Sequence, residues 1–397
     1  MLSAIRKSYT HTIYASYLGY ITQAIVNNFA PLLFLTFMSE FTLTVEKITL
    51  ITTVNFAVQL AVDAVAAKVV DRIGYRPCIV AAHVFAALGL AGLAVFPAIM
   101  PPFAGIMTAV VLYAIGGGII EVLISPIVEA CPTERKAAAM SLLHSFYCWG
   151  HVFLVVVSTA FFAAFGIGSW RVMACLWALA PLVNVAYFLL VPIAPIVSGE
   201  TKQLSIGELF RSRVFWVLMV MMVCAGASEQ AMSQWASAFA QMGLHVDKTM
   251  GDLAGPCAFA VFMGTARALY GKFERRIPLR GFMIASSIMC IGCYLLATLC
   301  QLPLLALVGC ALCGFSVGIY WPGTFSMAAV ALPGGGTAMY ALMALAGDLG
   351  CSGGPTVVGL VSGAAGGVMQ TGLLAAIAFP AVMLLLLCLT GRKRQGA

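Results

Sequence analysis

Long apolar runs with few charges recur along the whole of this 397-residue chain, and they constrain its fold more than any other feature. Each run is about 20 residues or longer, which is the length of a helix that crosses a bilayer, and none shows the alternation of a membrane β-strand. Charged residues make up only 9% of the chain, against roughly 25% in a soluble domain. Because a backbone inside lipid must satisfy its own hydrogen bonds, the runs predict an all-α membrane protein.

The charged and Pro/Gly-rich breaks between the runs divide the chain into twelve predicted spans. The first run, which begins after Arg6 and Lys7, is too long and too polar for a cleaved signal peptide and is counted as a span. The twelve spans are 10–38, 47–70, 77–98, 103–130, 137–165, 171–193, 214–242, 252–271, 281–300, 303–331, 337–363 and 367–390.

Basic residues test this division, because Lys and Arg gather on the cytoplasmic side of a membrane protein. With both termini inside, 17 of the 21 Lys and Arg residues fall at cytoplasmic ends, and only Lys47, Arg171 and Lys248 fall outside. The remaining one, Arg267, stays within a span. The asymmetry predicts a multi-pass protein of a bacterial cytoplasmic membrane, and it accounts for the net charge of +7 without nucleic acid as a partner.

The spans fall into two halves, 1–197 and 214–397, which the polar stretch 198–213 separates as a cytoplasmic linker. Both halves carry Gly- and Pro-rich polar spots at matching places, with Glu121 and Pro126 in span four and Trp321 and Pro322 in span ten. Such matching interruptions are typical of transporters whose site lies where two repeats meet.

Glu121 is the strongest candidate for a functional residue, since it is the only charge between Phe103 and Val128. A carboxylate in the middle of a span costs on the order of 3 kcal/mol, and such residues usually mark a substrate or proton path. Burial favours the protonated form of a carboxyl group, which would let Glu121 take up a proton near neutral pH. The alternative is a structural ion pair, for example with Arg267.

The second half offers further polar candidates. Glu229, Gln230 and Gln234 lie in the middle of span seven beside Trp235, whose ring could stack on a sugar while the amides bind its hydroxyls. The alternative is that these groups bind one another between helices. Asp348, the only charge of span eleven, could couple protons, and Arg267 is expected to neutralise one of the three carboxylates or to bind an anionic substrate.

The first half offers polar residues of the same kind in spans one and five. Gln23 and Asn27 could hold a solute from span one, and His144 and Tyr147 share one face of span five. The alternative for each is a satisfied residue of the helix bundle.

Several classes of function are disfavoured by the same sequence. No phosphate-binding Gly-x4-Gly-Lys-Ser/Thr motif occurs, which argues against an ATP-driven pump. The spacing of Cys290, Cys293, Cys310 and Cys313 resembles a zinc site, but all four lie in apolar runs without a supporting acid or His, so they are expected to pack as small hydrophobes. We therefore expect no metal, no cofactor and no enzyme activity.

The loop between spans two and three carries a family resemblance. Its string Ala67-Lys-Val-Val-Asp71-Arg72-Ile-Gly74-Tyr-Arg76 resembles the cytoplasmic signature of the major facilitator superfamily, with Ala67 at the usual first Gly. The resemblance implies the twelve-helix major facilitator fold and a gating role for Asp71, Arg72 and Arg76.

Within that superfamily the chain resembles the fucose/hexose–proton symporters. The likeness is carried by Glu121 with Ser125-Pro126, by His144 with Tyr147 and Gly150, by Glu229 with Gln230 and Trp235, and by Gly314 to Ser326 around Trp321 and Pro322. Span one departs from that family, because it has no acid where the family couples protons.

These observations lead to one hypothesis and two alternatives. The chain is expected to be a monomeric secondary transporter that takes up a small polyhydroxylated solute with protons. Glu121, Glu229 and Asp348 would couple protons, and Gln23, Asn27, His144, Tyr147, Gln230, Gln234, Trp235 and Trp321 would bind the solute.

The first alternative is an exporter or antiporter of amphipathic compounds. The second, a membrane sensor or intramembrane enzyme, would need an output domain or a catalytic set of residues, and the sequence shows neither.

Overall fold

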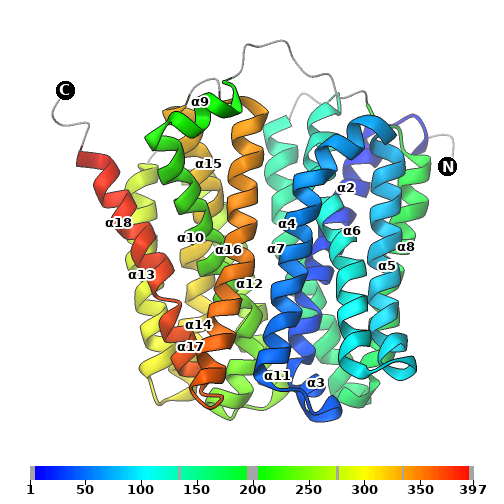
Figure 1. The fold of residues 1–397 in the computed structure, drawn as a ribbon, viewed down its shortest axis with the longest axis vertical. Coiled ribbons are helices and arrows are strands. Elements are labelled where there is room, and N and C mark those ends of the chain that lie inside the picture. Colours follow the sequence, from blue (N-terminus) through cyan, green and yellow to red (C-terminus); the bar gives the residue numbers. More distant parts are fainter. Residues whose placement is uncertain (1–4, 133–135, 195–203, 274–276, 333–334, 393–397) are drawn as a thin grey trace. The chain divides into compact units, whose positions relative to one another are not determined.

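The fold is almost entirely helical. This computed structural model describes residues 5–132, 136–194, 204–273, 277–332 and 335–392, and within these ranges no strand occurs (Figure 1). The described chain forms two compact units, one of residues 1–47 with 54–199 and one of residues 48–53 with 200–397.

The first unit contains the helices that correspond to predicted spans one to six. α5 packs most extensively against α6 and α8, and α2 packs against α6 and α7. The helices are α2 (Tyr9–Asn28), α3 (Phe34–Phe41), α4 (Val45–Ile73, whose residues 48–53 count with the second unit), α5 (Tyr75–Ile99), α6 (Pro102–Ala130), α7 (Lys136–Phe165) and α8 (Trp170–Leu190).

The second unit contains the helices that correspond to spans seven to twelve, with the short helix α9 before them. Its main pairs are α10 with α16 and α13 with α14. The helices are α9 (Ile206–Arg211), α10 (Arg213–Ala238), α11 (Lys248–Asp252), α12 (Ala258–Phe273), α13 (Leu279–Leu299), α14 (Pro303–Val317), α15 (Tyr320–Ala331), α16 (Gly336–Ala364), α17 (Met369–Ala375) and α18 (Ala378–Arg392).

Eleven stretches of the described residues are long and apolar enough to cross a membrane. The predicted eleventh span coincides with α16, a 29-residue helix that is less apolar than the other spans because it is rich in glycine and carries Asp348. Large apolar side chains such as Leu88, Val95 and Leu385 lie exposed on the helices, as expected of surfaces that face lipid. The prediction of an all-α membrane protein is confirmed.

Several predicted spans are not continuous α-helices. Span one contains a 3₁₀ turn at Ala30–Leu33, where Pro31 cannot donate a backbone hydrogen bond. Span seven ends in the π-helical segment Phe239–Gly243, and span eight contains a second one at Leu253–Cys257. Span ten breaks between α14 and α15. Such interruptions leave backbone groups that the surroundings must satisfy, and they are frequent at functional sites.

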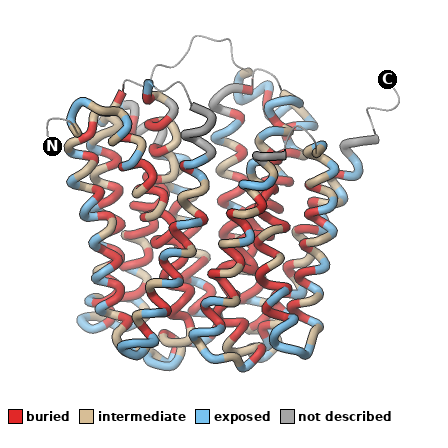
Figure 2. The backbone as a smooth tube through the Cα atoms, turned by 180° about the vertical axis from the view of Figure 1, so that it is seen from behind, coloured by how far each residue is buried: buried red, intermediate tan, exposed pale blue. Residues whose placement is uncertain are grey.

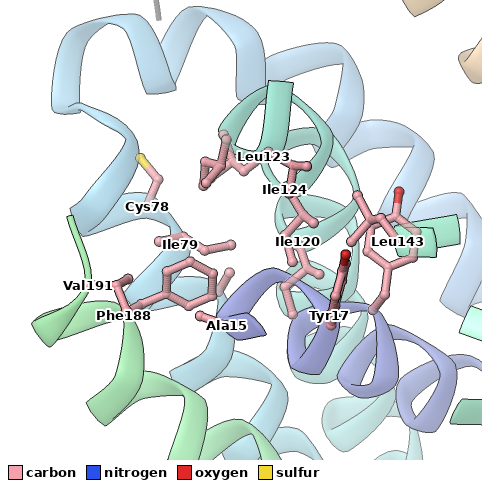
Figure 3. Packing of buried hydrophobic residues seen from close by; sticks show 14 of the residues in the cluster. Ala15, Tyr17, Cys78, Ile79, Ile120, Leu123, Ile124, Leu143, Phe188 and Val191 are labelled. Carbon is pink, nitrogen blue, oxygen red and sulfur yellow. The ribbon is translucent and has the colours of Figure 1, made fainter. Parts of the chain in front are cut away.

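Many helices have a buried and an exposed side, because the helical repeat brings every third or fourth residue to the same face, whereas residues 224–238 of α10 are all buried (Figure 2). One apolar cluster of the first unit joins α2, α5, α6 and α8, with Ala15, Ile79, Ile120 and Phe188 fully buried at its centre (Figure 3). This cluster packs around α6 and fixes the helix that carries Glu121.

Candidate functional site

The carboxyl group of Glu121 lies in a network of amide side chains in the first unit. Gln23 of α2 donates from Nε2 to Glu121 Oε2 at 2.9 Å and to Gln59 Oε1 of α4 at 2.9 Å. Gln59 in turn donates from Nε2 to Asn27 Oδ1 at 2.7 Å and to Asn55 Oδ1 at 3.1 Å. Asn55 donates to Asn27 Oδ1 at 3.2 Å. The structure thus brings three predicted site residues, Gln23, Asn27 and Glu121, into one connected network.

Two residues of this network, Asn55 and Gln59, are absent from the sequence-based candidates. They lie one helical turn apart on α4 and are 4% and 1% exposed. Their spacing of four residues inside a predicted span is the signal that could have found them, because such a pair shares a helix face.

Glycine at position 117 allows the helices to meet at this network. A Cβ atom on Gly117 would lie 3.0 Å from Gln23 Oε1 and 3.4 Å from Gln59 Cδ, and one on Gly118 would lie 3.1 Å from the Cα of Gln59. The run Gly116-Gly-Gly118 therefore lets α2 and α4 approach the backbone of α6 directly, which a side chain would prevent.

One turn beyond Glu121, a second polar group links α2, α6 and α7. The Tyr20 hydroxyl and Ser125 Oγ lie 3.1 Å apart, and the ring of His144 meets that of Tyr20 edge to face with 5.4 Å between centroids. The other predicted residue of α7, Tyr147, accepts a hydrogen bond from Asn28 Nδ2 at 3.4 Å. Both α7 candidates thus contact residues of α2.

The second unit holds an ion pair between a buried glutamate and a partly exposed arginine. Arg267 of α12 donates from Nη2 to Glu229 Oε2 of α10 at 3.4 Å and from Nε to the Gly318 carbonyl oxygen at 3.1 Å. Gly318 lies at the break between α14 and α15, where a backbone carbonyl is available to an arginine. The structure selects Glu229 from the three carboxylates proposed as neighbours of Arg267.

The polar face of α10 continues beside this pair. Gln230 donates to Glu229 Oε1 at 3.3 Å, and Gln234 donates to Gln230 at 3.0 Å. Trp235 is 1% exposed, and its indole N–H donates to the Pro355 carbonyl oxygen of α16 at 3.0 Å. This indole therefore packs between α10 and α16 and gives the Pro355 carbonyl oxygen a hydrogen-bond donor.

The remaining candidates of the second unit lie on α15 and α16. Asp348 is 5% exposed within α16. The Trp321 ring packs directly over Gly347, the residue before Asp348, and lies tilted against Phe325. Trp321 and Asp348 are thus near one another.

The predicted gating residues have different surroundings. Arg76, at the start of α5, donates to the carbonyl oxygens of Phe188, Leu189 and Val191 at 2.7, 3.2 and 2.8 Å, so it caps the end of α8. Arg72 is exposed in the last turn of α4. The side chain of Asp71 lies outside the described residues.

The four spaced cysteines are buried in the second unit, with the sulfurs of Cys290 and Cys313 4.0 Å apart. Among the described residues no group of three or more His, Cys, Asp or Glu side chains could hold a metal ion.

Comparison with known proteins decides the family. The model of the Major Facilitator Superfamily matches residues 16–355. The chain belongs to the major facilitator superfamily. It is therefore a transporter of small molecules that lies in a lipid bilayer.

Solved structures share the fold of this facilitator. The fucose–proton symporter FucP of E. coli is 17% identical, with a TM-score of 0.65 over 96% of this chain and 99% of its own. A bacterial homologue of the human lysosomal transporter Spinster is 17% identical, with a TM-score of 0.77 over 97% and 98%. A D-xylose–proton symporter is 14% identical, with a TM-score of 0.77 over 97% and 98%. No curated protein sequence matches the chain.

Proposed function

We propose that this facilitator takes up a small polyhydroxylated solute, such as a monosaccharide, together with protons. The observation that carries the proposal is the Glu121 carboxylate, which lies within a membrane span and accepts a hydrogen bond from an uncharged amide. An amide stabilises either form of a carboxyl group, whereas a cation would fix it in the ionised form.

The polar side chains of both units support a solute rich in hydroxyl groups. Amides offer donors and acceptors together, which suits hydroxyls, and the candidates for this role remain Gln23, Asn27, Gln230 and Gln234, with His144, Tyr147, Trp235 and Trp321 beside them. The fucose and D-xylose symporters that share the fold agree with a monosaccharide as substrate.

The carboxylates are proposed to have unequal roles. Glu121 carries the proton, and Asp348 is a second candidate. Glu229 is paired with the Arg267 guanidinium, so its coupling role would require that pair to open. Asp71, Arg72 and Arg76 are proposed to act at the cytoplasmic gate.

Uptake into proteoliposomes tests the proton role. Purified protein would be reconstituted, and uptake of labelled L-fucose, D-xylose and related sugars measured with and without an inward proton gradient. Glu121→Gln should abolish the gradient-driven part, whereas Glu46→Gln, at the exposed start of α4, should leave it intact. Unchanged gradient-driven uptake in Glu121→Gln would refute the proton role.

One observation favours an exporter or antiporter of amphipathic compounds. A groove of about 590 Å³ lies in the first unit, and the described residues of α4, α5 and α6 that line it are apolar, among them Val62, Val65, Cys78 and Ile119. A thermal-shift screen separates the two functions, because a ligand stabilises the protein that binds it. Stabilisation by lipophilic cations, with none by sugars, sugar acids or polyols, would favour export.

A further inference from the structure

The amide of Gln23 has one unused hydrogen-bonding atom. Gln23 is 2% exposed, and its Oε1 has no hydrogen-bond partner among the described residues, although Nε2 of the same amide donates twice. A buried acceptor without a donor is costly, and native proteins seldom tolerate one without a reason.

The orientation of this amide is fixed by its neighbours. Nε2 faces two acceptors, Glu121 Oε2 and Gln59 Oε1, and a turned amide would place Oε1 against both oxygens. Gln59 cannot turn to compensate, because its own Nε2 faces Asn27 Oδ1 and Asn55 Oδ1. The network therefore holds the Gln23 carbonyl oxygen beside Gly117, one helical turn from Glu121 on the same face of α6.

We propose that a protonated Glu121 and Gln23 form a two-point pair, in which the carboxyl O–H donates to Gln23 Oε1 while Gln23 Nε2 continues to donate to Glu121 Oε2. The inference rests on the proposed function, because Glu121 must take up the proton. No bond of the amide changes, and the proton stays on the carboxyl group. Side chains on a helix lean toward its N-terminus, so the carboxyl of Glu121 extends toward Gly117 and toward the Gln23 Oε1 atom beside it.

Gln23 can therefore hydrogen-bond to both the ionised and the protonated form of Glu121. The ionised carboxylate receives a charge-assisted hydrogen bond from Gln23 Nε2 and leaves Gln23 Oε1 without a donor, whereas the protonated carboxyl satisfies both atoms of the amide. Gln59 and Asn55 act as positioning residues, because they hold the amide in the one orientation that can accept the O–H. Glu229 differs, because the Arg267 guanidinium can only donate and the Oε1 atom of its other partner, Gln230, already accepts a hydrogen bond from Gln234.

Other titratable groups lie on the helices around Glu121. The Tyr20 hydroxyl lies beside Ser125, and His83 of α5 uses both ring nitrogens, on the Ile79 carbonyl oxygen and on Asn184. Asp63 of α4 and His144 and Tyr147 of α7 are further titratable groups on these helices. The test therefore follows Glu121 itself.

A double-mutant cycle on unfolding midpoints tests the pair. Glu121→Gln places a second amide opposite Gln23, which mimics the protonated carboxyl, and Gln23→Met removes both hydrogen-bonding atoms. Wild type, both single variants and the double variant would be unfolded in detergent at about pH 8.5 and about pH 5, with tryptophan fluorescence as the signal.

The sign of the coupling decides the outcome. With the two-point pair, Glu121→Gln raises the midpoint by more degrees when Gln23 is present than when Met replaces it, because a second hydrogen bond forms. This coupling should appear at the alkaline pH and shrink at the acidic pH, where Glu121 is already protonated. If Gln23 only donates to the carboxylate, Glu121→Gln weakens that bond and the coupling has the opposite sign. An opposite sign, or none at either pH, overturns the inference.

Two further measurements guard against misfolding and separate this inference from the proposed function. Gln59→Met leaves Glu121 and Gln23 in place but frees the Gln23 amide to turn, so the coupling should fall. Gln370→Met in the second unit should show no coupling with Glu121→Gln.

Infrared absorption of the protonated carboxyl, absent in Glu121→Gln, reports whether Glu121 titrates. A residue that titrates without the expected coupling refutes the pair alone, and one that never titrates refutes the pair and the proton role together.

Discussion

Arg76 and Arg280 make the same contact in the two units. Arg76, at the start of α5, donates to carbonyl oxygens at the end of α8, and Arg280, at the start of α13, donates to the carbonyl oxygens of Leu387 and Cys388 near the end of α18. Each arginine thus ties the third span of its half to the sixth. The free carbonyls of a helix end carry partial negative charge, so a cation placed there is stabilising.

Replacement of either arginine should therefore destabilise its unit. Arg76→Ala and Arg280→Ala each remove hydrogen bonds from a charged donor, which are worth about 1.5–3 kcal/mol each. We expect a lower unfolding midpoint in detergent for both variants. Arg72→Ala, at an exposed position in the same loop region as Arg76, should leave the midpoint within error; a similar loss there would argue against the capping role.

The ion pair of Arg267 and Glu229 gives a second prediction, because Arg267 neutralises the buried charge of Glu229. Arg267→Gln or Glu229→Gln alone leaves one charge unpaired and should cost about 3–5 kcal/mol, whereas the double variant should recover much of that loss. Unfolding midpoints of the three variants give the coupling. Additive losses in the double variant would show that the two charges do not depend on one another.

Two glycines of the second unit form a matched test of helix packing. A Cβ on Gly314 of α14 would collide with the backbone of Phe259, whereas one on Gly292 of α13 would meet no atom within 4 Å. Gly314→Ala should destabilise the protein by about 1–3 kcal/mol through overpacking. Gly292→Ala should stabilise it by up to about 1 kcal/mol through helix propensity. Equal midpoints for the two variants would contradict the close approach of α14 to α12.

The start of α9 predicts a pH dependence outside the membrane spans. The Glu208 carboxylate accepts hydrogen bonds from Ser205 N at 2.7 Å and Ser205 Oγ at 2.8 Å, and these bonds lower the pKa of Glu208. A lowered pKa in the folded state stabilises α9 above the ordinary pKa of a glutamate, and the contribution is lost as the pH falls through the folded-state value.

Amide hydrogen exchange of residues 206–211 in the whole protein, corrected for intrinsic rates, measures this effect. Protection in wild type should fall between neutral pH and about pH 3, while Glu208→Gln should show weaker protection that changes little over the same range. Protection that is the same in both proteins at neutral pH would mean that the cap does not stabilise α9.

Much of the fold and part of the site could be predicted from sequence. The rarity of Glu121 in an apolar run identified it, and the structure places Gln23 and Asn27 in the network beside it. Asn55 and Gln59 carry no charge, so the sequence alone does not distinguish them from polar side chains that pack elsewhere in a helix bundle. Trp235 was predicted as a stacking surface, yet its ring is buried and its N–H bonds Pro355.

The sequence by itself determined the apolar spans and the carboxylate of Glu121 within span four, because lipid penalises charge and unpaired backbone groups at every position along the chain. Only the tertiary structure decided which polar groups meet. A membrane helix is apolar on the sides that face lipid and on the sides that face its neighbours, so its pattern does not reveal which face packs inward. The pairing of Glu229 with Arg267, and of Glu121 with the half-used amide of Gln23, follows from helix packing alone.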